Sequence, residues 1–219
     1  MKKIFCSSLL FIFIPLISYS QTYLPGDNEL IMMPTAYTMP AGNSYFSDYE
    51  VFFLNYSYAI TSSTHLSIFS LFPITTAFYE TLTFGIKQNF TFSKTFKTAL
   101  YGGFIPETSS YAIGDVVSFG LPSKSFHASI AYVKYTENSK ADLIYMFGFR
   151  FDPSEITSLI IEYENTNTLL SESTFNGLIT FGIKLRSSTM SWELGAIRPL
   201  SDTGDLIFFP MLKAGYYFN

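Results

Sequence analysis

Apolar and polar residues alternate strictly along several stretches of the chain. In residues 178–186 one parity is bulky and apolar: Ile179, Phe181, Ile183 and Leu185. The other parity holds Thr180, Gly182, Lys184 and Arg186. After "SST" the alternation resumes, with Met190, Trp192 and Leu194 opposite Ser191, Glu193 and Gly195. A period of two is typical of β-strands with one apolar and one polar face, so residues 178–197 predict two strands joined by a tight turn.

The same pattern recurs along the chain and predicts an all-β protein. We expect strands near 45–58, 65–73, 79–90, 96–105, 111–121, 125–135, 141–151, 155–164, 175–186, 189–198 and 206–218. Alternation alone would also suit a soluble sandwich. Strands of about ten residues can cross a bilayer when tilted, whereas globular strands average about five or six. The bulky apolar face and the charged opposite face further favour a transmembrane up-and-down antiparallel β-barrel.

The connections support this fold and set the strand count. Tight turns such as "PSK" and "DPS" alternate with mostly longer polar loops, as periplasmic turns alternate with outer loops in outer-membrane barrels. Bacterial single-chain barrels have even strand numbers, so eleven strands require one more. Residues 28–37, interrupted by Pro34, are the candidate. We therefore predict twelve strands, with ten as the fallback, and residues 21–44 as a first strand, a plug in the lumen or a segment at the rim.

The N-terminus predicts export. "MKK" precedes an apolar stretch, and Ser18 and Ser20 precede a cleavage site before Gln21, which is typical of a secretory signal peptide over residues 1–20. The barrel would then comprise residues 21–219 in the outer membrane of a Gram-negative cell. Cys6 would leave with the signal peptide, so the mature chain could form no disulfide. Losing Lys2 and Lys3 shifts the formal net charge from −4 to −6, and no basic segment suggests nucleic acid.

Composition agrees with a lipid-facing surface. Aromatic residues make up 19% of the chain, and charged residues only 14% against roughly 25% in an ordinary soluble domain. Aromatic clusters near strand ends, including Tyr45, Phe46 and Tyr49, predict the girdles that seat a barrel at the membrane surfaces. The alternative is a sugar-binding platform formed by inward-pointing tyrosines.

Two segments resemble those of known barrels. The end, "KAGYYFN", resembles the C-terminal assembly signal of outer-membrane β-barrels through Gly215, Tyr216 and Phe218, although Asn219 follows the last aromatic residue. This resemblance implies recognition by the outer-membrane barrel insertion machinery. Residues 30–61 resemble poorly characterised outer-membrane proteins with an N-terminal Pro-Thr-Ala segment, some of which are associated with exopolysaccharide export.

Charged residues on the polar parity are the candidate lumen-lining group. They are Lys87, Arg150, Lys184, Arg186, Glu193 and Lys213. They could form ion pairs that fill a narrow barrel, since an unpaired buried charge is costly. They could also line a wet conduit, in which Lys and Arg favour anions.

Catalytic candidates are few. His127 and Ser129 resemble the His-x-Ser pair of outer-membrane lipid A deacylases, which implies Ser129 as nucleophile, His127 as base and an acidic residue such as Glu137 to orient it. The motif that follows the serine in that family is missing. A histidine in a polar lumen network is the alternative. With two histidines and no mature cysteine, we expect no metal site and no cofactor.

Three functional hypotheses follow. The first is a monomeric channel or transport barrel, surrounded by outer-membrane lipid, for small polar solutes. The second is a non-catalytic structural or accessory barrel of an envelope polysaccharide system. The third, the one enzymatic hypothesis, is a lipid A-modifying hydrolase. The first two require the same exterior, so the sequence does not separate them.

Overall fold

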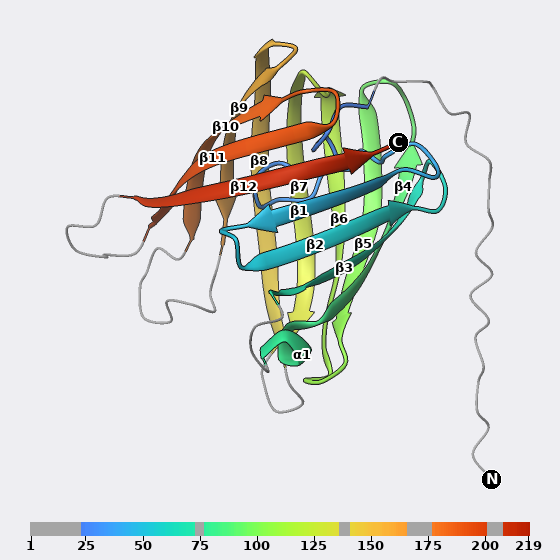
Figure 1. The fold of residues 1–219 in the computed structure, drawn as a ribbon, viewed down its shortest axis with the longest axis vertical. Coiled ribbons are helices and arrows are strands. Elements are labelled where there is room, and N and C mark those ends of the chain that lie inside the picture. Colours follow the sequence, from blue (N-terminus) through green and yellow to red (C-terminus); the bar gives the residue numbers. More distant parts are fainter. Residues whose placement is uncertain (1–22, 73–76, 136–140, 166–176, 201–207) are drawn as a thin grey trace.

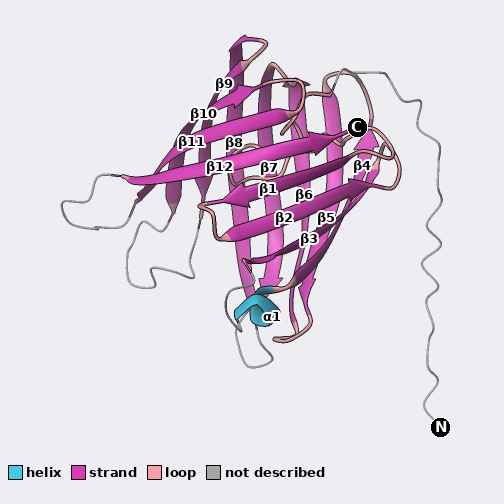
Figure 2. Ribbon diagram, in the orientation of Figure 1, coloured by secondary structure: helices cyan, strands magenta, loops and turns pink. Residues whose placement is uncertain are grey.

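Twelve strands form one closed antiparallel barrel (Figures 1 and 2). The computed structural model describes residues 23–72, 77–135, 141–165, 177–200 and 208–219, so the expected signal peptide lies outside the described residues. The strands are β1 (Ser44–Tyr49), β2 (Phe53–Ala59), β3 (Thr64–Leu71), β4 (Thr83–Thr91), β5 (Phe96–Ile105), β6 (Ser110–Leu121), β7 (Lys124–Lys134), β8 (Ala141–Ser154), β9 (Thr157–Glu164), β10 (Leu178–Arg186), β11 (Met190–Pro199) and β12 (Phe209–Phe218). One short helix, α1 (Ala77–Thr81), lies between β3 and β4. No helix in the described ranges is long and apolar enough to cross a membrane.

Each strand pairs with its neighbours in the chain, and β1 closes the barrel against β12. Ser44 lies opposite Phe218, and Tyr49 lies opposite Lys213. Every strand therefore has a partner on both sides, which satisfies the backbone hydrogen-bonding groups that an open edge would leave exposed. The expected all-β up-and-down barrel of about twelve strands is confirmed.

The prediction of a single strand over residues 45–58 is wrong, because the structure has two strands there. β1 ends at Tyr49, the chain turns at residues 50–52, and β2 begins at Phe53, which pairs back with Tyr49. Glu50 and Val51 adopt φ of 57° and 67°. The Phe52 N–H donates to the Tyr49 carbonyl, so Glu50 and Val51 are the central residues of this turn. A type I′ turn needs positive φ at both central positions and usually has Asn or Gly there. "EV" carries no such signal, so the turn was not predictable from composition.

Residues 28–37 supply no wall strand. They lie inside the barrel, and the twelfth strand comes from the division of 45–58. The count of twelve is therefore right, although the strand proposed to complete it is wrong. Within the segment, only an isolated antiparallel bridge joins Glu29 and Pro34.

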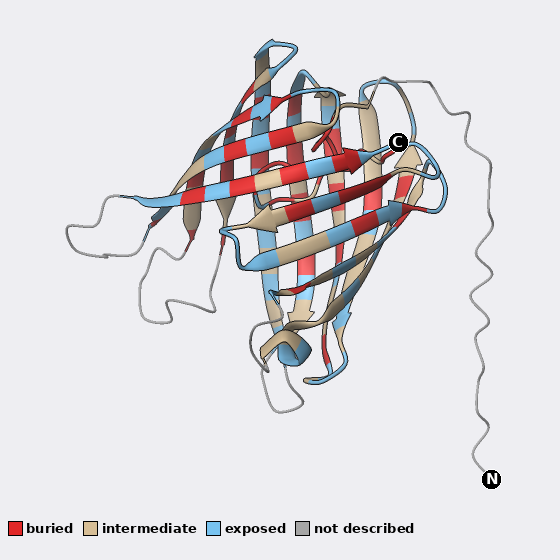
Figure 3. Cartoon of the chain, viewed as in Figure 1, coloured by how far each residue is buried: buried red, intermediate tan, exposed pale blue. Residues whose placement is uncertain are grey.

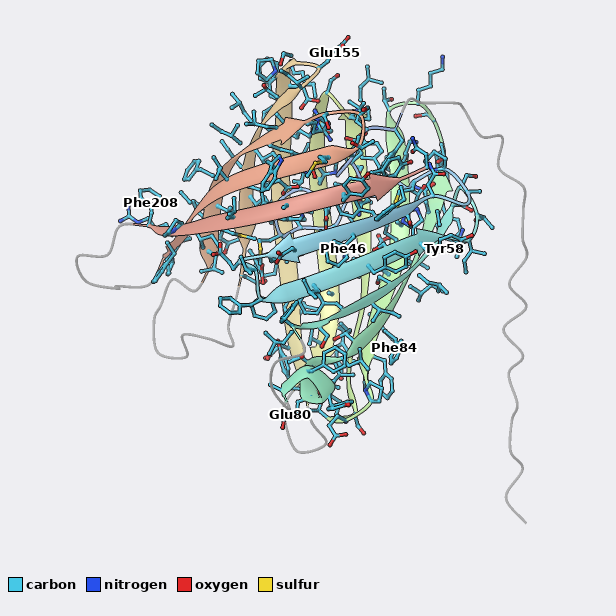
Figure 4. The ribbon with its side chains drawn as sticks, viewed as in Figure 1. Phe46, Tyr58, Glu80, Phe84, Glu155 and Phe208 are labelled. Carbon is cyan, nitrogen blue, oxygen red and sulfur yellow. The ribbon has the colours of Figure 1, made fainter. Side chains whose placement is uncertain are left out.

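The two faces of the wall follow the expected parity. Buried and exposed residues alternate in bands along the strands (Figure 3), and Phe46, Tyr58 and Phe84 project from the outer face (Figure 4). Asp115 is an exception, because it shares the outer parity of β6 and accepts a hydrogen bond from Thr98 Oγ1 at 2.8 Å. Of the aromatics predicted as a girdle, Tyr45 and Tyr49 instead face the lumen; Tyr45 is fully buried, and the Tyr49 hydroxyl donates to Glu29 inside the barrel.

The two ends of the barrel differ. The short-turn end carries residues 60–63, 92–95, 122–123, 155–156 and 187–189, and also the start of β1 and the end of β12. The long-loop end carries the other connections, of which 50–52 and 106–109 are short. This matches the expected asymmetry in outline.

Candidate functional site

Residues 23–43, called the plug from here on, fill much of the barrel lumen. Leu30, Ile31, Met33, Ala36 and Met39 are at most 1% exposed. The segment bends into a short hairpin, in which the Leu30 N–H donates to the Met33 carbonyl at 2.8 Å. In Figure 1 it is the blue stretch behind β12 and β1. Of the alternatives predicted for residues 21–44, the plug is the one that the described residues adopt.

The tip of the plug is bound by one wall carboxylate. Glu162, on β9, accepts hydrogen bonds from the backbone N–H groups of Ile31, Met32 and Met33 at 2.9–3.2 Å. Three consecutive N–H groups pointing at one anion form a concave anion site in the backbone. Since hydrogen bonds to a charged group are the strong ones, this contact anchors the tip.

Three wall lysines bind backbone carbonyl groups of the plug. Lys184, on β10, donates to the carbonyl oxygens of Gly26, Glu29 and Leu30 at 2.7–3.2 Å. Lys213, on β12, donates to that of Ile31 at 3.1 Å. Lys87, on β4, donates to those of Asn28, Thr35 and Tyr37 at 3.0–3.2 Å. These side chains supply the hydrogen bonds that a segment outside the sheet would otherwise lack.

The same lysines also take part in ion pairs. Lys184 lies 3.1 Å from Glu193 on β11, a register partner, and Lys213 lies 3.4 Å from the same carboxylate. Lys213 also lies 2.8 Å from Glu29 of the plug, whose other oxygen accepts from the Tyr49 hydroxyl at 2.9 Å. Burial alone would raise the pKa of Glu29, but the Lys213 and Lys184 ammonium groups and the Tyr49 hydroxyl together outweigh burial and lower that pKa below its usual value. Glu29 is therefore bound as a carboxylate.

Two arginines bind a second carboxylate of the plug. Asp27 Oδ1 lies 2.6 Å from Arg150 Nη1 and 3.0 Å from Arg186 Nη1. Asp152 on β8 bridges the same two guanidinium groups from the other side, at 2.8 and 2.7 Å. All six predicted lumen residues therefore lie on the inner face, and they meet around the plug.

Charge is balanced between wall and plug in this network. Among the described residues, the wall contributes the cations Lys87, Arg150, Lys184, Arg186 and Lys213, and the carboxylates Asp152, Glu162 and Glu193. These eight wall residues have an excess of two positive charges. Lys97 on β5, which lies over the ring of Tyr37 in the plug at 5.5 Å, is a further wall cation outside this set. Asp27 and Glu29 of the plug neutralise that excess, so the two surfaces are electrostatically complementary.

Glycines on the inner face make room for the plug. A methyl group at Gly182 would overlap Ile31 Cδ1, and one at Gly148 would overlap Leu30 Cδ1. Both glycines share the parity of the charged residues, which the sequence pattern had shown. Their purpose was not predicted, because the alternation identifies the inner face but not what packs against it.

The catalytic candidates do not form a nucleophile–base pair. His127 Nδ1 lies 2.7 Å from Ser118 Oγ and its Nε2 lies 2.9 Å from Ser125 Oγ, while Ser129 Oγ lies 2.8 Å from the Tyr101 hydroxyl. His127 is fully buried inside the barrel, and Glu137 lies outside the described residues. The Ser118 hydroxyl also accepts from the Ala36 N–H, so this histidine network supports the plug.

His65 supports the plug in a similar way. Its Nε2 accepts the N–H of Met39 at 2.8 Å, where the plug returns toward β1. Sequence analysis had assigned no role to this residue. Within the described ranges no group of three metal-binding side chains occurs.

A cavity of about 200 Å³ lies beside the plug, against β2–β5. Its polar lining includes Asn55 and Ser57 of β2, Ser67 of β3, and Tyr101 of β5. Lys87 and Glu29 border it, but both are engaged in the contacts described above. The plug therefore fills the lumen unevenly, and the lining of the unfilled part combines hydroxyl and amide groups with apolar residues such as Met32 and Ile86.

Comparisons with known proteins concern the fold alone. Neither a protein-family model nor a curated protein sequence matches the chain. OmpF of Salmonella typhi, solved in complex with daunomycin, is similar with a TM-score of 0.44 and 9% identity over 76% of this chain, which spans 61% of OmpF. LpxR from Salmonella typhimurium is similar with a TM-score of 0.42 and 12% identity; the match covers 80% of this chain and 99% of LpxR. OccK11 of Pseudomonas aeruginosa is similar with a TM-score of 0.38 and 9% identity; the match covers 80% of this chain and 63% of OccK11.

Proposed function

We propose that the protein is an outer-membrane transport barrel for small polar solutes, closed by its own N-terminal plug. The single observation that carries this proposal is how the plug is bound. The charged contacts described above join it to the wall through ion pairs and hydrogen bonds that water and solute ions could replace. A segment bound in this way can leave a wet lumen without breaking any pair of the barrel sheet.

The apolar outer face supports the location. Exposed large apolar side chains occur on every strand of the wall. In water they would form an exposed apolar patch far larger than those of ordinary soluble proteins. Lipid is the environment in which such a closed barrel is stable. Cleavage before Gln21 would place the start of the plug close to the mature N-terminus, and Gly215, Tyr216 and Phe218 would carry recognition by the insertion machinery. We expect the barrel to act as a monomer.

A planar-bilayer experiment tests the proposal. Single-channel conductance is measured for the full mature chain and for a variant lacking residues 21–40, after a heat-dependent shift in gel mobility has shown that both are folded barrels. We expect rare openings in the full chain and a steady conductance in the deletion variant. A folded deletion variant that never conducts would overturn the transport proposal.

The second candidate is a structural or accessory barrel of an envelope polysaccharide system. The apolar part of the plug favours it, since Leu30, Ile31 and Met33 pack with Val116, Ile160 and Met211 of the wall into one buried cluster. A permanently closed lumen needs such a core. A folded deletion variant without conductance would favour this candidate.

A further inference from the structure

The paired guanidinium groups of Arg150 and Arg186 form a site of their own. Their side chains are about 1% exposed, on β8 and β10, and the Asp27 carboxylate oxygen lies between their Nη1 atoms. Asp152 binds other nitrogens of the same two groups, Arg150 Nη2 and Arg186 Nη2, and Ser158 Oγ accepts from Arg186 Nη2 at 2.7 Å. The two arginines carry one charge more than Asp152 can neutralise. Asp27 supplies the missing negative charge.

Asp27 occupies this position as a ligand would. Only its Oδ1 contacts the arginines, while its Oδ2 accepts the Leu24 N–H of the plug itself at 2.9 Å. Removing the plug would leave two guanidinium donors aimed at a single empty point. Guanidinium forks match the geometry of carboxylate and phosphate oxygens, so the site is built for an oxyanion.

The site lies near the short-turn end of the barrel. Arg150 pairs with Ser125, just after the turn at 122–123, and the Arg186 N–H donates to Ile156 in the turn at 155–156. The chain also enters and leaves the wall at this end, at Ser44 and Phe218. An anion arriving there would meet Asp27 before the tip of the plug.

We propose that Arg150 and Arg186 form an oxyanion-binding site, and that a solute carrying a carboxylate or phosphate group competes with Asp27 for it and thereby displaces the plug. This inference rests on the proposed function, since it names the class of solute that opens the barrel. The plug aspartate then acts as an internal competitor, and the closed state is the form in which the solute is absent.

Plug displacement can be measured by thiol labelling. The mature chain contains no cysteine if the signal peptide is removed, so Leu30→Cys would introduce a single reactive group at a fully buried position of the plug. The labelling rate of this variant is measured in vesicles against increasing inorganic phosphate. Chloride at matched ionic strength is the comparison, because it screens charge without offering the oxyanion geometry.

We expect phosphate to raise the labelling rate about tenfold in a saturable way, and chloride to raise it less and without saturation. Two matched pairs of substitutions locate the effect. Asp27→Asn with Arg186→Gln should abolish the saturable response, whereas Glu29→Gln with Lys213→Gln loosens the plug but should retain it. Each pair removes one plug carboxylate and one wall cation, so net charge is unchanged.

Two results would overturn the inference: equal effects of phosphate and chloride, or a saturable response that survives in the Asp27 and Arg186 pair. Labelling reports plug movement and does not require conduction. If the deletion variant conducts but phosphate has no specific effect on labelling, the oxyanion site alone is refuted. If the deletion variant does not conduct, the transport proposal is refuted, whatever phosphate does to labelling.

Discussion

Ile31 of the plug occupies the space that Gly182 of β10 leaves by having no side chain. Gly182 pairs with Gly195 of β11 in the sheet, so two adjacent wall positions without side chains form one recess. The plug tip fits this recess, and its polar backbone is bound by Glu162 next to it. The wall and plug are thus matched in shape as well as in charge.

Filling the recess should expel the plug tip. Gly182→Leu would place a side chain where Ile31 Cδ1 lies, and overpacking of this kind costs about 1–3 kcal/mol. We expect the labelling rate of Leu30→Cys to rise by about tenfold, since 1.4 kcal/mol corresponds to a factor of ten. Gly195→Ala, in the same recess, is the control, because a methyl group there would meet Met211 Cβ at 3.4 Å and Ile31 Cγ2 at 3.7 Å, which are ordinary van der Waals distances. Equal rates in the two variants would contradict this packing.

Removing the charge of Glu162 should release the same tip by another route. Glu162 Oε1 accepts from all three N–H groups and Oε2 accepts a second time from Met32. Glu162→Gln replaces one oxygen by an amide NH₂ group and removes the charged character of the remaining bonds. Hydrogen bonds to charged groups contribute about 1.5–3 kcal/mol, so plug closure should weaken by that order. Glu164→Gln, two residues along on the same face of β9, is the matched control. The ratio of closed to open time in single-channel records measures the effect, and a change shared by both variants would refute a specific role for Glu162.

The deletion variant should select anions. Without Asp27 and Glu29, the network around the lumen retains an excess of two positive charges over the wall carboxylates described above. Cationic pore linings favour anions. Reversal potentials under a potassium chloride gradient should therefore show chloride preferred over potassium, and the preference should fall in a Lys184→Gln version of the same variant. Cation preference would mean that the charges outside this network control the pore.

The alternation around Lys184 and Glu193 was sufficient to predict the wall. A period of two identifies a strand and both its faces. Many long strands with an apolar outer face suit a bilayer, and in a bilayer the sheet must close into a barrel so that no backbone group is left without a hydrogen-bond partner. The turn at Glu50 and Val51 was missed because tertiary contacts stabilise it. The Glu50 N–H donates to the Leu212 carbonyl at 2.9 Å, and its carboxylate accepts from the Leu212 N–H at 2.5 Å, both on β12.

The site was predictable only in part for a related reason. Parity placed Arg150 and Lys213 on the inner face, but nothing local specified whether they would face water, each other or another segment. Their partners in the plug are Asp27, Glu29 and the Ile31 carbonyl, which lie over one hundred positions away. Pro34 was the one local signal that residues 28–37 would not form a regular wall strand, because proline donates no backbone hydrogen bond.

Asp115 provides a test of what covers the outer face. Its carboxylate lies on the outer parity of β6, bonded to Thr98, beside Leu100 and Ile130 as register partners. A carboxylate facing lipid is costly, so Asp115→Val should stabilise the barrel by about 1–2 kcal/mol in lipid vesicles. Denaturant titration of refolded protein measures this difference. Ser129→Val is the inner-face comparison and should destabilise the barrel instead, because it removes the hydrogen bond to the Tyr101 hydroxyl. A loss of stability in Asp115→Val would mean that a polar partner, rather than lipid, covers this position.

The Glu29–Lys213 pair should make part of plug closure dependent on pH. Lys213 holds the pKa of Glu29 below its ordinary value of 4.5, so the carboxylate is favoured in the closed state. The stabilisation is then fully present above pH 4.5 and is lost as pH falls through the lower pKa of the closed state. In Glu29→Gln this contribution is absent at every pH.

The difference in open probability between wild type and Glu29→Gln should therefore be constant from pH 7 to about 5 and should vanish under stronger acid. Comparison within this pair of proteins cancels every contribution to plug closure that the two proteins share. A difference that persists unchanged to pH 2 would show that Glu29 closes the plug through its shape and not through its charge.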